Sequence, residues 1–206
     1  MKVLIINGSP HANGTTAGAL AEMEKIFLEN GVETETILVG NKVIRGCIGC
    51  YNCGRLGKCV FDDPVNEAAE KLDQADGFVI ASPVYFASAN GALVSFLDRL
   101  MYSSKTVDKT MKVAAAVAVA RRGGTTATFD QLNKYITYGG FAVATSQYWN
   151  IAHGMDAEDL KEDLEGLQTM RTLARNMVFM MKSIALGKEK YGLPEKEARI
   201  STNYIR

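Results

Sequence analysis

The residues with the clearest chemistry are the four cysteines of the chain, Cys47, Cys50, Cys53 and Cys59. Their spacing is Cys-x2-Cys-x2-Cys-x5-Cys, and glycines between them allow a tight backbone that brings N–H groups close to sulfur. Three thiols at steps of three residues converge on one face of a compact loop, which suits the corner of a cubane iron–sulfur cluster. The spacing favours one [4Fe–4S] cluster. Free thiols, a redox disulfide and zinc are the alternatives.

A second group of polar residues follows the apolar run at residues 2–6. The turn reads Gly8-Ser9-Pro10-His11-Ala12-Asn13-Gly14 and continues into Thr15 and Thr16. Hydroxyls, an amide, backbone N–H groups and a helix N-terminus can together bind a phosphate. The turn is neither Gly-x-Gly-x-x-Gly nor a Walker loop, so a dinucleotide is disfavoured. The alternative is that these hydroxyls merely cap a helix.

Two later loops offer a place for a flat ring. Residues 82–90 (Ser-Pro-Val-Tyr-Phe-Ala-Ser-Ala-Asn) present aromatic and apolar surface, and residues 121–126 (Arg-Arg-Gly-Gly-Thr-Thr) present N–H and guanidinium donors, among them Arg121. A phosphate at one loop and a planar ring between two others describe a flavin mononucleotide (FMN) site. Taken one by one, these aromatics and glycines are more typical of ordinary packing and of an ordinary turn.

Strands and helices must position these loops. Apolar runs, one of them partly alternating, predict strands over residues 2–6, 32–39, 77–82, 112–120 and 141–145. Helical spacing predicts helices after each strand, the last from about residue 157 to 186. This alternation predicts an α/β fold, an open parallel sheet covered on both faces, whose ligands bind at the carboxyl ends of the strands. We expect one domain over residues 1–186, with a cysteine-rich loop at 40–63 and a tail at 187–206.

Together, the first turn, the Ser82–Tyr85 loop, the Leu97-Asp98-Arg99 segment and the Gly123-Gly124 turn resemble the flavodoxin-like NAD(P)H-dependent FMN reductase superfamily over roughly residues 1–185. The resemblance implies a doubly wound sheet in the order 2-1-3-4-5 and non-covalent FMN. It implies a phosphate site of Ser9, His11, Asn13, Gly14, Thr15 and Thr16, and a ring site of Pro83, Val84, Tyr85, Phe86, Ala87, Gly123 and Gly124. His11 stands where many relatives carry Arg, so the phosphate loses a fixed charge.

The cysteine stretch is similar to that of the iron–sulfur flavoproteins, a branch of the same superfamily. All four positions match the Cys-x2-Cys-x2-Cys-x4–7-Cys pattern and its place after the second strand. The resemblance implies that Cys47, Cys50, Cys53 and Cys59 are the cluster ligands. Because loops after neighbouring strands share a sheet edge, the cluster and the flavin are expected to form an electron relay.

Composition excludes several other classes. Of the 206 residues, 47% are hydrophobic and 22% charged, which argues against disorder. Lys plus Arg and Asp plus Glu each number 23, so no basic excess favours nucleic acid. No run approaches the roughly 18 apolar residues of a membrane span, and the first residues do not suit a signal peptide. We therefore expect a cytoplasmic protein.

The sequence thus predicts an FMN-dependent oxidoreductase. It would pass electrons from NAD(P)H or ferredoxin to a small acceptor: a quinone, a flavin or an oxygen species. The flavin does the chemistry, so no protein acid or base is predicted. The alternatives are a non-catalytic redox carrier or thiol-based sensor, and a flavin reductase whose thiols hold nothing. Relatives are commonly dimers or tetramers, which implies a homo-oligomer with the tail as a loose end or an inter-subunit arm.

Overall fold

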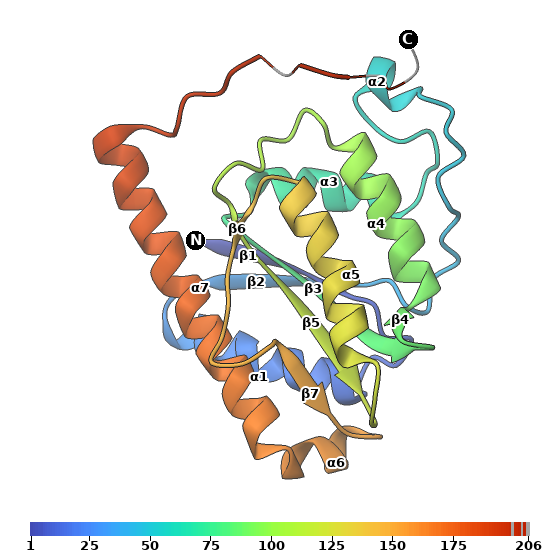
Figure 1. The fold of residues 1–206 in the computed structure, drawn as a ribbon, viewed down its shortest axis with the longest axis vertical. Coiled ribbons are helices and arrows are strands. Elements are labelled where there is room, and N and C mark those ends of the chain that lie inside the picture. The colour runs from blue at the N-terminus through green and yellow to red at the C-terminus, as the bar shows by residue number, and fades with distance from the viewer. Residues whose placement is uncertain (199, 203, 205–206) are drawn as a thin grey trace.

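A parallel sheet forms the centre of the molecule in the computed structural model, which describes residues 1–198, 200–202 and 204 (Figure 1). Its strand order is β2-β1-β3-β5-β6. The strands are β1 (Lys2–Asn7), β2 (Glu33–Leu38), β3 (Gly77–Tyr85), β5 (Val113–Ala120) and β6 (Ala142–Val143). The predicted order 2-1-3-4-5 is confirmed when the strands of this sheet are counted along the chain.

The fifth position of the sheet differs from the prediction because two short strands share it. Both β6 and β7 (Ile151–His153) pair in parallel with β5, at its start and at its end respectively. Between them the chain leaves the sheet, and Asn150 covers the gap: its Nδ2 donates to Ala116 O and its own carbonyl accepts from Ala118 N. The predicted strand at residues 141–145 therefore contains only the first piece.

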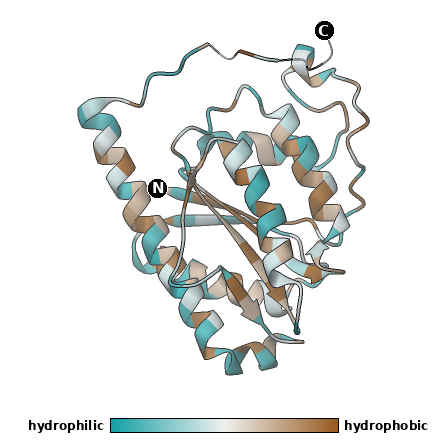
Figure 2. Cartoon of the chain, in the orientation of Figure 1, coloured by the Kyte–Doolittle hydropathy of each residue, from teal (hydrophilic) through white to brown (hydrophobic). Residues whose placement is uncertain are grey.

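Helices cover both faces of the sheet (Figure 1). One face carries α1 (Thr15–Glu29), α6 (Ala157–Glu162) and α7 (Leu164–Tyr191), and the other carries α3 (Pro64–Gln74), α4 (Gly91–Ser103) and α5 (Thr125–Tyr138). Successive side chains of a strand point to opposite faces. Accordingly Val3 and Ile5 of β1 join the first core, and Leu4 and Ile6 join the second. Figure 2 shows the hydrophobic colour concentrated on the strands, with hydrophilic residues on the outer helical turns.

The last predicted helix is divided and extends further than expected. Asp163 interrupts it between α6 and α7, and its carboxylate accepts from Gly166 N and His153 N. The second part, α7, runs past residue 186 to Tyr191 and ends at Gly192, whose φ is +75°. Lysines in the last turn favour this extension because they face the negative end of the helix dipole.

The described part of the tail crosses the end of the molecule that carries α2 (Cys53–Leu56) (Figure 1). Lys196 Nζ lies 2.7 Å from Asp108 Oδ1. The predicted tail at 187–206 falls partly outside the described residues, and its role as an inter-subunit arm stays a prediction. No described helix is long and apolar enough to cross a membrane.

Candidate functional site

The first polar turn lies at the N-terminus of α1 and leaves that helix end open. Gly14 occupies the N-cap position, and among the described residues no side chain caps the helix and no acid lies in its first turn. Thr15 and Thr16 are buried there, and Ser9 Oγ accepts from His11 N at 3.1 Å instead of capping a helix amide. Free N–H groups, the positive helix end and nearby hydroxyls suit an anion. His11 and Asn13 are exposed at the rim.

Close backbone packing holds this turn against the sheet edge. Asn7 Oδ1 accepts from Ser9 N at 2.9 Å, and Gly8 N donates to Ala81 O at 2.8 Å. A Cβ on Gly40 would lie 2.2 Å from Gly8 O, so the turn after β2 touches the first turn directly. No local signal in the sequence indicated the roles of Asn7 and Gly40, because these roles depend on a neighbouring strand.

The predicted ring loop is a hairpin and not an irregular loop. Strand β3 pairs antiparallel with β4 (Ser88–Ala89) through Val84↔Ala89 and Tyr85↔Ser88. The central residues, Phe86 and Ala87, have φ of +51° and +58°. Positive φ at both central positions is usual for Asn-Gly, and it costs other residues about 1–2 kcal/mol each. Such strain is concentrated at ligand clamps.

The aromatic side chains of this hairpin do not pack in the core. Phe86 is fully exposed and Tyr85 is 44% exposed, so the packing alternative does not hold for Phe86. Pro83 and Val84 are half-buried below them. An exposed apolar tip on a strained turn is a surface on which a flat ligand can lie.

The hairpin is anchored to α5 and to the turn after β5. Gln131 Oε1 accepts from Ser88 Oγ and Ala89 N, both at 2.8 Å. Gly124 has a φ of +91°, and a Cβ there would lie 2.8 Å from Val84 Cγ1 and 3.0 Å from Ala87 Cα. Gly123 adjoins open space, and Arg121 is exposed. The structure therefore brings the two predicted ring loops together at the carboxyl ends of β3 and β5, next to β1.

All four cysteines line one small cavity, together with Tyr51, Phe61, Arg99 and Tyr102. The thiols are free; two are exposed and two half-buried. The cavity measures about 20 Å³, which is room for about one water molecule. In the part of the chain that the structure describes, no three His, Cys, Asp or Glu side chains come close enough to hold a metal ion. The structure thus gathers the predicted ligands without closing them around a metal.

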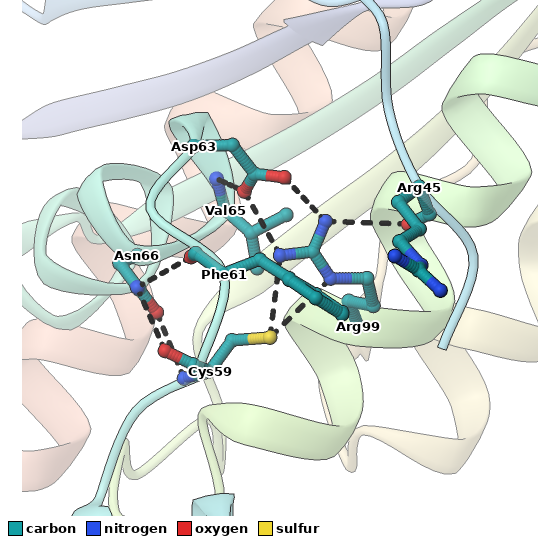
Figure 3. A network of polar contacts seen from close by, with 7 residues as sticks. All are labelled: Arg45, Cys59, Phe61, Asp63, Val65, Asn66 and Arg99. Atoms are coloured by element: carbon teal, nitrogen blue, oxygen red, sulfur yellow. Dashed lines mark hydrogen bonds and ion pairs between the residues drawn. The ribbon is translucent and has the colours of Figure 1, made fainter. Parts of the chain in front are cut away.

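Cys59 differs from the other cysteines because a buried guanidinium contacts its sulfur (Figure 3). Arg99 of α4 is 1% exposed and forms an ion pair with Asp63. Burial lowers the pKa of Arg99, but the hydrogen bonds to Asp63 and Cys59 outweigh it, so the net pKa is raised and the group stays charged. In the sequence Arg99 is only part of the Leu97-Asp98-Arg99 segment, and no local pattern predicted its contact with Cys59.

A larger cavity of about 1070 Å³ adjoins the cysteine loop at Cys47. It lies between α4, α5 and the segment that joins α4 to β5, and four lysines line it: Lys105, Lys109, Lys134 and Lys196. Burial lowers the pKa of Lys109, whose Nζ donates to Val107 O and Ser104 O. Asp98 and Asp108 also line this cavity, and Lys196 forms an ion pair with Asp108, so Lys105 and Lys134 are the exposed lysines there without a carboxylate partner among the described residues.

Comparison with known families agrees with this geometry. The family model described as NADPH-dependent FMN reductase matches residues 1–156. The chain therefore belongs to the NADPH-dependent FMN reductase family and is a flavin-dependent oxidoreductase. The predicted superfamily is confirmed.

Two relatives match nearly the whole chain. An iron–sulfur flavoprotein of Methanocaldococcus jannaschii is 34% identical over 191 residues, which cover 89% of this chain and 99% of the relative. An iron–sulfur flavoprotein of Methanosarcina thermophila is 27% identical over 194 residues, which cover 92% of this chain and 100% of the relative. The chain is thus similar to proteins of the branch that the cysteine pattern resembles.

Solved structures confirm the flavodoxin-like fold. RosB, solved with bound 8-demethyl-8-formylriboflavin-5'-phosphate, has a TM-score of 0.68 at 17% identity over 100% of this chain and 94% of its own. The NAD(P)H:quinone oxidoreductase from Methanothermobacter marburgensis has a TM-score of 0.66 at 17% identity over 86% of this chain and 96% of its own. At these identities the likeness concerns the fold alone.

Proposed function

We propose that this protein is an oxidoreductase that binds FMN across the carboxyl ends of β1, β3 and β5 and moves electrons between a reduced donor and a small acceptor. The observation that carries the proposal is the meeting of an open helix N-terminus with an exposed, strained aromatic hairpin at one sheet edge. When bound, FMN supplies hydride and single-electron chemistry. The protein binds and orients it.

The phosphate would lie at the start of α1. Ser9, Thr15 and Thr16 supply hydroxyls close to free helix amides, and Asn13 and Gly14 shape the turn. The exposed His11 donates one hydrogen bond through a ring N–H. The uncapped helix end supports this assignment because its N–H groups need an acceptor. The missing Arg at residue 11 leaves the helix dipole as the main positive charge.

The ring would lie on the hairpin. Pro83, Val84, Tyr85, Phe86 and Ala87 offer an apolar surface, while Arg121, Gly123 and Gly124 approach from the turn after β5. The close contact between Gly124 and the hairpin supports one shared site, since neither loop can move without the other. Donors at this edge can orient the polar side of the ring.

For the cysteines we propose a [4Fe–4S] cluster bound by Cys47, Cys50, Cys53 and Cys59. Four free thiols lining one cavity are the donor set such a cluster takes, and the two relatives are named iron–sulfur flavoproteins. The cavity must widen to accept the cluster, and glycines with positive φ on the loop, Gly49 and Gly57, allow this. Zinc and an empty thiol loop are the alternatives.

The proposed donors are NAD(P)H and a ferredoxin, and the proposed acceptors are a quinone, a free flavin or an oxygen species. Exposed Lys105 and Lys134 near the cysteine loop support a donor with an acidic surface, because complementary charge steers association. We also propose a cytoplasmic location, since free thiols persist in a reducing compartment. We further propose that the protein is a homodimer or homotetramer, as the family resemblance implies.

A thiol-based redox sensor is the second candidate, favoured by the exposure of Cys47 and Cys50. One anaerobic preparation separates the candidates. We expect a flavin spectrum, four iron and four sulfide per chain, and turnover of NAD(P)H or reduced ferredoxin with a quinone. Bound flavin without turnover by any donor would favour the sensor. Colourless protein that does not bind added FMN would refute the proposed function.

A further inference from the structure

The side chain of Arg99 is the largest fully buried one among the described residues, and it points its donors at a predicted cluster ligand. Its Nε and Nη2 lie 3.3 and 3.2 Å from Cys59 Sγ. On the far side, Nη1 and Nη2 donate to the Asp63 carboxylate, and Nη1 also donates to Arg45 O. Figure 3 shows the guanidinium between the sulfur and the carboxylate, with the Phe61 ring beside it.

One side chain also holds both backbone polar groups of Cys59. Asn66 Oδ1 accepts from Cys59 N at 2.9 Å, and Asn66 Nδ2 donates to Cys59 O and Phe61 O. Among the described residues, Cys53 Sγ forms one hydrogen bond, to Tyr102 O at 4.0 Å, and the sulfurs of Cys47 and Cys50 form none. Side chains of Arg99 and Asn66 therefore hold both the sulfur and the backbone of Cys59.

We propose that Arg99 is a positioning residue that sets the reduction potential of the cluster through its two N–H···S hydrogen bonds to Cys59. This inference rests on the proposed function, because it requires the cysteines to hold the cluster. One-electron reduction adds one negative charge to the cluster and its thiolates, and no bond to a proton or leaving group changes. Charged donors against a ligand sulfur stabilise the reduced state more than the oxidised state, and hydrogen bonds to sulfur are a known determinant of cluster potential.

Asp63 does not cancel this effect. The Asp63 oxygens accept from the two terminal nitrogens of Arg99, while Nε donates to Cys59 Sγ and not to Asp63. Arg99 is 1% exposed and Cys59 is half-buried, so water screens the sulfur from the nearer charge only weakly. Arg45 provides a matched comparison: its guanidinium also lies over the Phe61 ring, at 5.1 Å, but the residue is exposed and donates to no cysteine.

The test uses anaerobically purified full-length protein and an electron paramagnetic resonance titration with dithionite and redox mediators. Arg99→Lys keeps the charge and loses the fork that binds sulfur and carboxylate together. Arg99→Met combined with Asp63→Asn removes both buried charges, and Asn still caps α3. Arg99→Lys is compared with wild type, and the double variant is compared with Asp63→Asn. Arg45→Met is the control for losing a nearby positive charge that does not contact a cysteine. Arg99 lies eight residues, about 12 Å along the helix axis, from the start of α4 at Gly91, so FMN content should not change.

We expect the equilibrium constant for one-electron reduction to fall at least tenfold in both Arg99 variants, which is a shift of about 59 mV toward negative potential. Arg45→Met should change it less than twofold. Equal potentials in the Arg99 variants and their parents would overturn the inference. So would folded Arg99 variants that bind FMN but assemble no cluster, since Arg99 would then act in assembly. A wild-type protein without iron and sulfide would instead remove the proposed cluster itself.

Discussion

Gly40→Ala should weaken FMN binding although Gly40 is not one of the proposed FMN-binding residues. The new Cβ would lie 2.2 Å from Gly8 O and Ser9 C and 2.4 Å from Ser9 O. Ordinary contact begins at 3.4 Å, so the two turns must separate by more than 1 Å. The atoms in the way belong to the backbone and cannot rotate aside, so the phosphate turn must shift.

The expected size follows from the bonds at that turn. A shift of this size would remove at least one hydrogen bond to the charged phosphate, worth about 1.5–3 kcal/mol. Since about 1.4 kcal/mol corresponds to a tenfold change in affinity, the dissociation constant of FMN should rise about 10- to 100-fold. Overpacking should also lower the free energy of unfolding of the FMN-free protein by about 1–3 kcal/mol.

The assay is titration of FMN-free protein with FMN, followed by quenching of flavin fluorescence, with thermal unfolding recorded in parallel. Gly187→Ala is the control, because it adds the same methyl group in open space on α7. The control should bind FMN normally and gain up to about 1 kcal/mol from helix propensity. A folded Gly40→Ala protein that binds FMN as tightly as wild type would refute the placement of the phosphate at this turn.

Three further changes test other contacts. Gly124→Ala places a side chain at a φ of +91° against the hairpin, and should raise the FMN dissociation constant about tenfold in the same titration. Tyr135→Phe removes the hydrogen bond to Asp98 and should cost about 1 kcal/mol in denaturant unfolding near pH 7. Burial first, then Asp98, raises the pKa of Tyr135 above 10.0, so its contribution is present below pH 10 and declines as the pH rises through the folded-state pKa. The variant should lack this alkaline decline, and an unchanged pH profile would contradict the assignment. Asn66→Ala loses three hydrogen bonds around Cys59 and should lower the free energy of unfolding by about 2 kcal/mol. It should also lower the iron content of anaerobically purified protein. Full iron content in this variant would show that Cys59 does not need these hydrogen bonds.

The elements of the core could be predicted from the sequence because their signals are local. The apolar run of β1 identifies a strand with both faces covered, and its alternate residues do join separate cores. Pro64 marks the start of α3, and the cysteine spacing predicted a shared site, which the common cavity supports. Each of these signals depends on residues within one or two turns of the chain.

Other features depended on contacts between distant residues. The left-handed backbone of Phe86 and Ala87 goes against their own preference and is imposed by the pairing of β3 with β4. The fifth strand is split because Asn150 satisfies backbone groups of β5 that a continuous strand would have paired.

The sequence by itself determined the alternating α/β pattern, the polar turns after the strands and the set of four thiols. Only the tertiary structure decided that Gly40 touches the phosphate turn and that Arg99 reaches Cys59 across 40 positions of the chain. The physical reason is that patterns of polarity and turn residues act over a few residues. A buried charge or a close backbone approach is decided by which segments the packed sheet brings together.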